Sequence, residues 1–166
     1  DKTAAEKVAS SLPEKRTLVI GVDVSDVTSV RAMFDRVVEQ FGKVDVLINN
    51  AGVHATGSVL DSSLEDWERI SAIDINGVVY CSKFALPHLL KSKGCIVNTA
   101  SVSGLGGDWG AAYYCAAKGA VSNLTRAMAL DHGGDGVRVN AVCPSLVKTN
   151  MTADFPEEVN QKFNER

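Results

Sequence analysis

Four short segments rich in valine and isoleucine alternate with helix-forming segments along this 166-residue chain. They are residues 17–24, 44–48, 94–99 and 137–142. Each is nearly continuous in apolar residues, which is typical of strands buried on both faces of a parallel sheet. Strands that alternate with helices in this way predict a doubly wound α/β fold, a parallel sheet with flanking helices.

The segments between the apolar runs show the three-to-four-residue spacing of amphipathic helices. Ser25 is the predicted N-cap of the second helix, and Gly42 is predicted to end it. Pro144 follows the fourth strand and breaks it. The predicted helices are residues 3–12, 25–42, 64–91 and 111–131, with one more short helix at 155–166.

The composition is that of a globular protein, with 45% hydrophobic and 22% charged residues. It excludes a disordered chain. The 17 basic and 20 acidic side chains give a net charge of −3, which argues against nucleic acid as the main partner. A membrane span would need about 18 consecutive apolar residues, and the sequence contains no such stretch.

The cysteines lack the C-x-x-C spacing of metal and redox motifs, and the three histidines lie apart from one another. We therefore expect no metal site, and we expect reduced thiols in apolar surroundings, as in a cytosolic protein. The four cysteines are Cys81, Cys95, Cys115 and Cys143.

Ligands of open α/β sheets bind beyond the carboxyl ends of the strands. Small and polar residues occupy all four of these ends, at Asp23–Val24, Asn49–Gly52, Thr99–Ser103 and Cys143–Thr149. Because polar loops after strands are common, this pattern by itself indicates only where a site would lie.

Tyr114 and Lys118 lie four residues apart, which places them on one face of a helix. A lysine cation favours the phenolate and lowers the pKa of a nearby tyrosine, so the pair can move a proton at a carbonyl or alcohol oxygen. A surface helix produces the same spacing by chance. Ser101 ends the third strand, where its hydroxyl would meet the same oxygen or simply cap a turn. Ser103 and Tyr113 are the neighbouring alternatives.

Four features follow one another in an order and spacing that resemble the short-chain dehydrogenase/reductase family. They are Asn49-Asn50-Ala51-Gly52, Ser101, the pair Tyr114 and Lys118, and the segment Pro144–Thr149. The resemblance covers essentially all 166 residues. It implies a Rossmann-like fold and an oxidoreductase that transfers a hydride between a nicotinamide cofactor and a small secondary alcohol or ketone.

The resemblance also implies a role for each site residue. Tyr114 would be the catalytic acid and base, Lys118 would lower the Tyr114 pKa and hold the nicotinamide ribose, and Ser101 would orient the substrate oxygen. The implied cofactor contacts are Asp23 and Val24 at the adenine, Asn50, Ala51 and Gly52 at the adenine ribose, and Pro144, Val147 and Thr149 beside the nicotinamide.

The chain departs from the family pattern in its long helix. The family has an asparagine seven residues after a tryptophan, and counting from Trp67 gives Asp74. Gly77 falls where the family has its glycine, which favours this register over one that uses Asn76. The family's asparagine acts through its main chain, a role that Asp74 can fill, so Asp74 completes the expected catalytic set.

Two glycine features also differ. The family's usual Pro-Gly is Pro144-Ser145 in this chain. Residues 104–110 imitate the dinucleotide fingerprint, but their glycine spacing is G-x-G-x-x-x-G and no acidic strand end follows. They lie between Ser101 and Tyr114, where the family has a substrate-side loop.

The resemblance implies that residues 1–166 form a single, partial Rossmann-like domain without the Gly-rich phosphate loop or the C-terminal strand. In the strand order 3-2-1-4-5-6 the chain would supply strands 3 to 6. In the family, the residue that separates NAD from NADP ends the second strand of the sheet, and that strand is not among those that this sequence would supply. We expect NAD, with NADP as the alternative.

The long helices carry apolar residues on more than one face. The resemblance implies that these helices form a subunit interface, so we expect a homo-oligomer, a dimer or a tetramer. The reduced thiols lead us to expect it in the cytoplasm. Three alternatives stay open. One is a non-catalytic dinucleotide-binding scaffold, another is a lyase or epimerase acting on nucleotide sugars, and the last is a reductase of a different carbonyl substrate.

Overall fold

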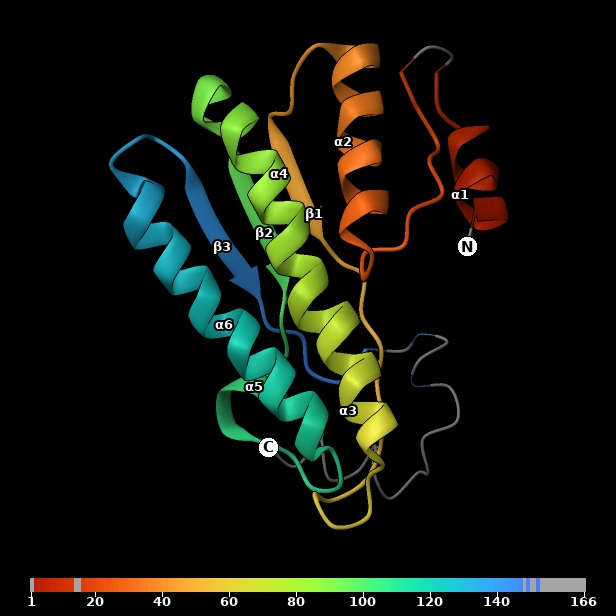
Figure 1. The fold of residues 1–166 in the computed structure, drawn as a ribbon, viewed down its shortest axis with the longest axis vertical. Helices are drawn as coiled ribbons and strands as arrows, with labels where there is room; N and C mark the ends of the chain where they lie inside the picture. The colour runs from red at the N-terminus through yellow and green to blue at the C-terminus, as the bar shows by residue number, and fades with distance from the viewer. Residues whose placement is uncertain (1, 14–15, 148, 150–151, 153–166) are drawn as a thin grey trace.

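The computed structural model describes residues 2–13, 16–147, 149 and 152. Its centre is a parallel sheet with the order β1-β2-β3, formed by β1 (Val46–Asn49), β2 (Cys95–Thr99) and β3 (Arg138–Val142) (Figure 1). These strands confirm three of the predicted ones to within two residues at each end. Their connections are helical, as parallel neighbours require.

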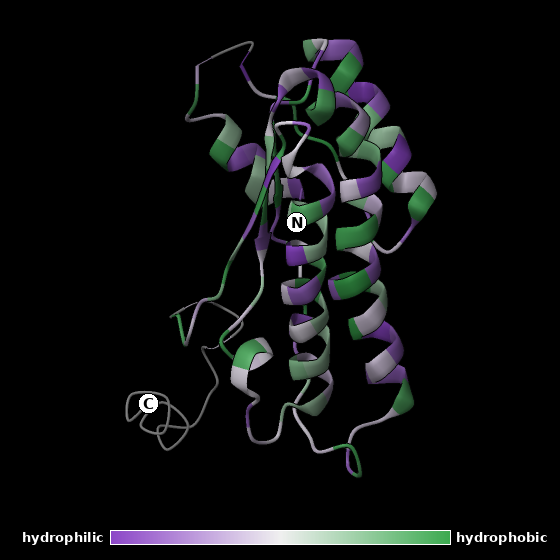
Figure 2. Ribbon diagram, turned by 90° about the vertical axis from the view of Figure 1, so that its left-hand side faces the viewer, coloured by the Kyte–Doolittle hydropathy of each residue, from purple (hydrophilic) through white to green (hydrophobic). Residues whose placement is uncertain are grey.

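Three long helices cover one face of this sheet: α2 (Val27–Phe41), α4 (Gly77–Ser92) and α6 (Ala112–Gly133) (Figures 1 and 2). The chain thus has the parallel sheet and flanking helices of an α/β Rossmann-like protein. The first helix, α1 (Lys2–Ala9), lies apart from the other three and buries none of its residues.

The main core lies between the sheet and these helices. Ile96 and Val139 are paired in register, and both point from the sheet toward the helices. They pack with Phe34 of α2 and Leu89 of α4 in one buried cluster. This burial explains why the strands are rich in branched aliphatic side chains.

The opposite face of the sheet is open. Val46 and Ile48 of β1 are 54% and 65% exposed, and Val142 of β3 is 50% exposed. The prediction of strands buried on both faces is therefore wrong for β1 and β3. The reason is that the three long helices all lie on one side, and within the described residues no such helices cover the apolar residues of the outer strands on the other side.

Residues 17–24 do not form the predicted strand. A strand requires the backbone groups of a neighbouring strand, and within the described residues the sheet places none beside this segment. Leu18, Val19 and Ile20 are half-buried, so the segment keeps some apolar contacts without a ladder of hydrogen bonds.

The second helix begins one residue later than predicted. Asp26, not Ser25, is the N-cap, and its carboxylate accepts from the Thr28 N–H at 2.8 Å. Ser25 instead donates its hydroxyl to Asp23 at 2.6 Å. Gly42 ends the helix with φ 75°, as predicted, because this left-handed conformation favours glycine.

The predicted helix 64–91 consists of three parts. It begins as α3 (Leu64–Ile70), continues as the π-helical segment η1 (Ser71–Asn76) and ends as α4. The predicted helix 111–131 is confirmed as α6, and the short α5 (Ser103–Gly106) includes the start of the Gly-rich segment 104–110. The helix predicted at 155–166 lies outside the described residues.

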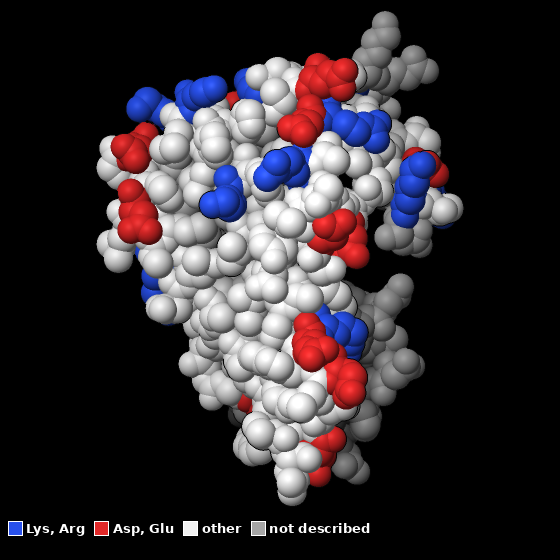
Figure 3. Space-filling model, viewed as in Figure 1, with Lys and Arg blue, Asp and Glu red and all other residues white. Residues whose placement is uncertain are grey.

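The charged side chains and the cysteines follow the pattern of an ordinary globular surface and core. Figure 3 shows basic and acidic side chains interspersed on the helical face, without a continuous basic stripe there. All four cysteines are free thiols, Cys81 buried and the other three half-buried. Within the described residues, no helix is long and apolar enough to cross a membrane, and no cluster of His, Cys, Asp and Glu could hold a metal ion.

Candidate active site

A cavity of about 690 Å³ lies at the carboxyl ends of the three strands. Loops from all three ends line it: residues 50–52 after β1, residues 99–103 at and after β2, and residues 144–147 after β3. The start of α6 and the π segment complete its walls. The cavity is thus at the edge of the sheet where the sequence predicted a ligand.

Ser101 follows β2 and is 7% exposed. Its hydroxyl accepts from the Ser103 N–H at 3.2 Å and donates to the Ser103 hydroxyl at 3.1 Å. Ser103 in turn donates to a carboxylate oxygen of Asp108 at 2.6 Å. This chain of hydrogen bonds holds the Ser101 oxygen in place at the cavity wall.

Close packing of two backbones brings the Ser101 loop against α6. A Cβ atom at Gly104 would lie 2.6 Å from the Lys118 carbonyl oxygen and 2.7 Å from the Gly119 nitrogen. Only glycine permits this approach, because backbone atoms cannot move aside as a side chain can. Gly104 therefore permits the close packing that brings the Ser101 loop against the start of α6, where Tyr114 and Lys118 lie.

Tyr114 lies in the first turn of α6 and forms a side-chain hydrogen bond with Ser101. Its ring contacts the ring of His54, with centroids 4.7 Å apart. The His54 loop is tied to the start of α6 by backbone bonds from Gly57 N–H to Gly110 and from Ala112 N–H to Gly57, at 2.7 and 3.2 Å. The loop after β1 therefore forms one wall around the phenol.

The environment of Tyr114 raises its pKa above the ordinary value. Burial is the main cause, the hydrogen bond with Ser101 lowers the pKa, and the negative charge of Asp74 raises it. The net direction is opposite to the lowering that the sequence led us to expect from Lys118. Burial lowers the pKa of His54, which favours its neutral form.

Lys118 and Asp74 form a buried ion pair at the base of the site. The ammonium nitrogen lies 3.0 Å from Asp74 Oδ2, with the two side chains 5% and 0% exposed. Lys118 also donates to the Thr99 carbonyl at 3.0 Å and lies 5.6 Å from the centroid of the Tyr114 ring. The sequence placed both residues in the site but did not predict their contact.

The π segment η1 explains how Asp74 reaches the interior. One wider turn within a long helix shifts the register of the side chains, and such turns occur often at functional sites. Asp74 lies within this turn, fully buried, and its Oδ1 accepts from the Val53 N–H at 2.8 Å. The helix therefore changes its winding at the position where the chain carries the buried carboxylate.

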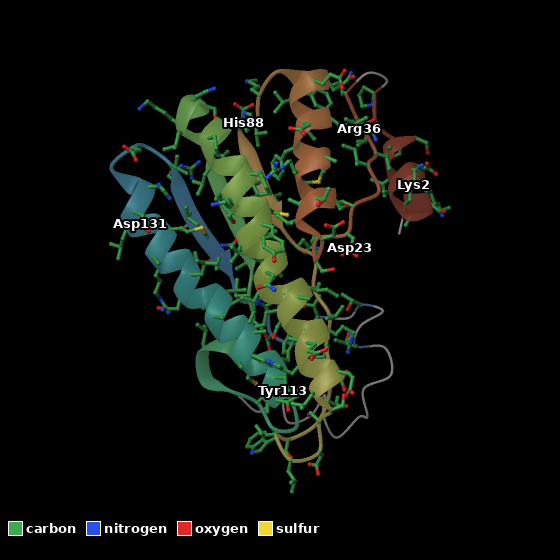
Figure 4. The ribbon with its side chains drawn as sticks, viewed as in Figure 1. Lys2, Asp23, Arg36, His88, Tyr113 and Asp131 are labelled. Atoms are coloured by element: carbon green, nitrogen blue, oxygen red, sulfur yellow. The ribbon has the colours of Figure 1, made fainter. Side chains whose placement is uncertain are left out.

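Most of the predicted site residues meet in this cavity. Its lining includes Asn50, Ala51, Gly52, Asp74, Ser101, Tyr114, Lys118, Pro144, Val147 and Thr149. Asp23 and Val24 are outside the lining: Asp23 lies near the start of α2 (Figure 4), and Val24 packs against Gly77. Their contact with an adenine stays a prediction.

The alternatives Ser103 and Tyr113 have different outcomes. Ser103 lines the cavity and supports Ser101. Tyr113 lies at the start of α6 (Figure 4), outside the cavity lining, and its ring packs against the ring of Trp67 at 5.4 Å. Adjacent residues on a helix point about 100° apart, so only one of the two tyrosines can enter the site.

Sequence reasoning missed His54 and Asp108. Neither residue shares a helix or strand with Tyr114 or Ser101, so no helical or strand spacing links them. Loops bring both residues to the site. A signal for His54 was its position two residues after Gly52, in the loop that follows a strand end. Asp108 follows a pair of glycines in the loop between Ser101 and Tyr114, and this position is its only signal in the sequence.

A family model described as short chain dehydrogenase matches residues 1–160. Together with the parallel sheet and the site at its carboxyl edge, this match shows that the chain belongs to the short-chain dehydrogenase family. The chain is 70% identical to meso-2,3-butanediol dehydrogenase of Serratia marcescens over 165 residues, which are 99% of this chain and 66% of that protein.

Two proteins of Xanthobacter autotrophicus are more distant relatives. A 2-(S)-hydroxypropyl-CoM dehydrogenase is 43% identical over 89% of this chain and 59% of that protein. A second protein, described as an inactive 2-(S)-hydroxypropyl-CoM dehydrogenase, is 42% identical over 89% of this chain and 64% of that protein. The chain spans about two thirds or less of the length of these three relatives.

Proposed function

We propose that this chain is part of an NAD-dependent oxidoreductase that interconverts a small secondary alcohol and a ketone, with 2,3-butanediol and acetoin as its substrates. The meeting of Ser101, Tyr114 and Lys118 at one cavity is the observation that carries the proposal. The 70% identity to a protein named meso-2,3-butanediol dehydrogenase supports the choice of substrate.

The residues of the cavity have distinct tasks in this reaction. Tyr114 donates its phenolic proton to the carbonyl oxygen during reduction, and its phenolate takes the proton from the alcohol during oxidation. Ser101 hydrogen-bonds the same oxygen, which requires its hydroxyl to turn from Ser103 toward the substrate. Lys118 donates one N–H to the Thr99 carbonyl, and its ammonium carries two further N–H groups. We propose that a ligand in the cavity accepts from one of these.

We infer that a nicotinamide cofactor binds in this cavity, which lies at the carboxyl ends of the strands. When bound, the cofactor supplies or accepts the hydride. A Cβ atom at Gly52 would lie 3.0 Å from Asp74 Oδ2 and 3.2 Å from the Lys118 nitrogen, so this glycine keeps the backbone close to the buried pair. We propose that the cofactor is held by cavity-lining residues and, at its adenine end, by Asp23 and Val24. The cavity-lining residues are Asn50, Ala51, Gly52, Tyr114, Lys118, Pro144, Val147 and Thr149.

The variant Tyr114→Phe tests the assignment of the proton donor. It removes the phenolic oxygen but keeps the ring that packs against His54. We expect turnover to fall about 10³-fold, the middle of the range that acid–base catalysis contributes, while fluorescence titration still shows cofactor binding. The matched control is Tyr113→Phe, which removes the same atom outside the cavity and should keep full activity. Retained activity in Tyr114→Phe would contradict the proposal.

Steady-state assays test the substrate and the cofactor. We expect activity with acetoin, diacetyl and one or more isomers of 2,3-butanediol, and a higher kcat/KM with NAD than with NADP. Activity restricted to other ketones would favour the alternative of a reductase with a different carbonyl substrate.

The non-catalytic alternative draws support from the relative described as inactive. A scaffold of this kind would bind the dinucleotide and show no turnover with any small alcohol or ketone. The buried chain from Ser101 to Asp108 favours an enzyme, since a scaffold has no need to orient this hydroxyl.

We also propose that the protein is a cytoplasmic homo-oligomer, a dimer or a tetramer. Trp67 is 37% exposed and Val79 39% exposed on the helices α3 and α4, and they supply apolar surface for a second subunit. Sedimentation of the purified protein would measure the state directly, and a monomer would contradict this part of the proposal.

A further inference from the structure

The carboxylate of Asp74 receives a different donor on each of its oxygens. Oδ1 accepts from the Val53 N–H at 2.8 Å, and Oδ2 lies 3.0 Å from the Lys118 ammonium. Among the described residues no aligned hydrogen bond reaches Oδ2, so this second contact is electrostatic. Asp74 is fully buried, and Gly52 covers the pair closely. Little solvent screens the interaction.

We propose that Asp74 is an electrostatic positioning residue, whose carboxylate holds and neutralises the Lys118 ammonium and thereby sets the proton affinity of Tyr114. The inference rests on the proposed function, in which Tyr114 moves the proton. It assigns to the Asp74 side chain a task that a main-chain role would not need.

An asparagine at position 74 cannot perform this task. A carboxylate offers acceptors on both oxygens, whereas an amide offers one acceptor oxygen and one NH₂ donor. An amide that accepts from Val53 N–H would point its NH₂ toward the Lys118 ammonium. One that accepts from Lys118 would point its NH₂ toward the Val53 N–H.

The position of Lys118 links this pair to the phenol. Its ammonium lies 5.6 Å from the centroid of the Tyr114 ring, and the Thr99 carbonyl holds it from the other side at 3.0 Å. A lone cation at this place would favour the phenolate. Because Asp74 neutralises it, the phenol keeps its proton to higher pH. The pKa of Tyr114 agrees with this direction, since the charge of Asp74 raises it.

Other groups around Tyr114 also affect its proton affinity, so a test of Asp74 must leave them unchanged. His54 packs on the ring from the loop after β1, Cys115 is its neighbour on α6, and Ser101 hydrogen-bonds it. Arg69 and Asp108 act on His54 from α3 and from the loop before α6. A substitution at position 74 leaves all of these groups in place.

The variant Asp74→Asn removes the charge with almost no change in size. In the oxidation direction the rate rises with pH as Tyr114 loses its proton, so a lower proton affinity moves the profile to lower pH. We expect the midpoint of the kcat/KM profile for alcohol oxidation to fall by about one pH unit, the lower end of the effect of a close charge. The matched control is Asp66→Asn, which breaks an exposed ion pair with Arg69 of the same 3.0 Å length and should leave the profile in place.

A second readout needs neither substrate nor cofactor. The near-ultraviolet absorbance of phenolate, taken as the difference from the Tyr114→Phe protein, reports the titration of Tyr114 alone. We expect its midpoint to fall in Asp74→Asn and to stay in place in Asp66→Asn. If no alcohol is oxidised, the proposed function fails, and this titration still decides the inference.

The outcomes are distinct. A merely structural Asp74 would lower the melting temperature and kcat of Asp74→Asn but leave both midpoints unchanged, and this would overturn the inference. If Asp74→Asn does not fold, Asp74→Ser removes the same charge with a smaller group and should shift the midpoints in the same direction. Failure of both variants to fold would assign Asp74 a structural role and would overturn the inference as well.

Discussion

The buried Asp74 carboxylate depends on the Lys118 ammonium for its compensating charge. The variant Lys118→Met leaves the carboxylate buried without its cation, which costs about 3–5 kcal/mol of the free energy of unfolding for comparable buried pairs. Urea denaturation measures this loss. The matched control is Lys43→Met, because Lys43 and Asp45 form an ion pair of the same 3.0 Å length at the surface. Exposed pairs contribute little, so the control should unfold at the same urea concentration as the parent.

The double variant Asp74→Asn, Lys118→Met completes the comparison. It removes both charges, so we expect it to recover part of the stability lost in Lys118→Met alone. A double variant that is less stable than either single variant would show that the pair is held by packing and not by charge.

At the scale of single residues, the sequence identified the position of Asp74 but not its partner. Counting seven residues on from Trp67, with Gly77 as a check on the alignment, is enough to locate Asp74 in a helix. The contact with Lys118 joins two elements 44 residues apart through the π turn, and no local pattern records such a distance.

At the scale of elements, the start of α2 separates the two capping candidates. Asp26 accepts from the Thr28 N–H, whereas Ser25 bonds to Asp23 in the preceding turn. We expect Asp26→Ala to cost about 1 kcal/mol of stability, the usual loss for an N-cap. Asp26→Asn should cost far less, because asparagine caps nearly as well. Thermal unfolding of the variants, with Ser25→Ala as the comparison, measures the difference. An equal or larger loss in Ser25→Ala would contradict the cap seen in the structure.

Helices and central strands were predictable because their signal is periodic and local. The apolar spacing in 25–42 and 111–131 is the pattern that packs against the sheet, and Gly42 marks an end because its φ is positive. The π segment at 71–76 carries no such signal, since its sequence continues the helical spacing on both sides. The prediction of a strand at 17–24 was wrong for a different reason. A strand forms only beside another strand, and the sheet places none of the described residues there.

At the scale of the whole molecule, the described residues leave apolar side chains of the outer strands exposed on one face of the sheet. Exposed apolar strands at the edge of a sheet promote association. Ile48 is 65% exposed on β1, while Ile96 on the neighbouring strand is fully buried. We expect Ile48→Thr to leave the melting temperature nearly unchanged and to reduce self-association in sedimentation and light scattering.

Ile96→Thr is the matched control on the covered face. It places a hydroxyl in the core cluster and should destabilise the chain by about 2 kcal/mol or more. Equal effects of the two substitutions on stability would show that both faces of the sheet are covered in solution.

The sequence by itself determined the parallel α/β class, three strands, the long helices and a site at the carboxyl edge. These follow from alternation, helical spacing and short motifs, all of which are properties of neighbouring residues. Only the tertiary structure decided which partner each polar group has. It placed Asp74 on Lys118, His54 on Tyr114, and Ser103 between Ser101 and Asp108. The reason is that buried charges and hydroxyls are satisfied by whatever the packed elements bring within about 3 Å, and the packing depends on the whole chain.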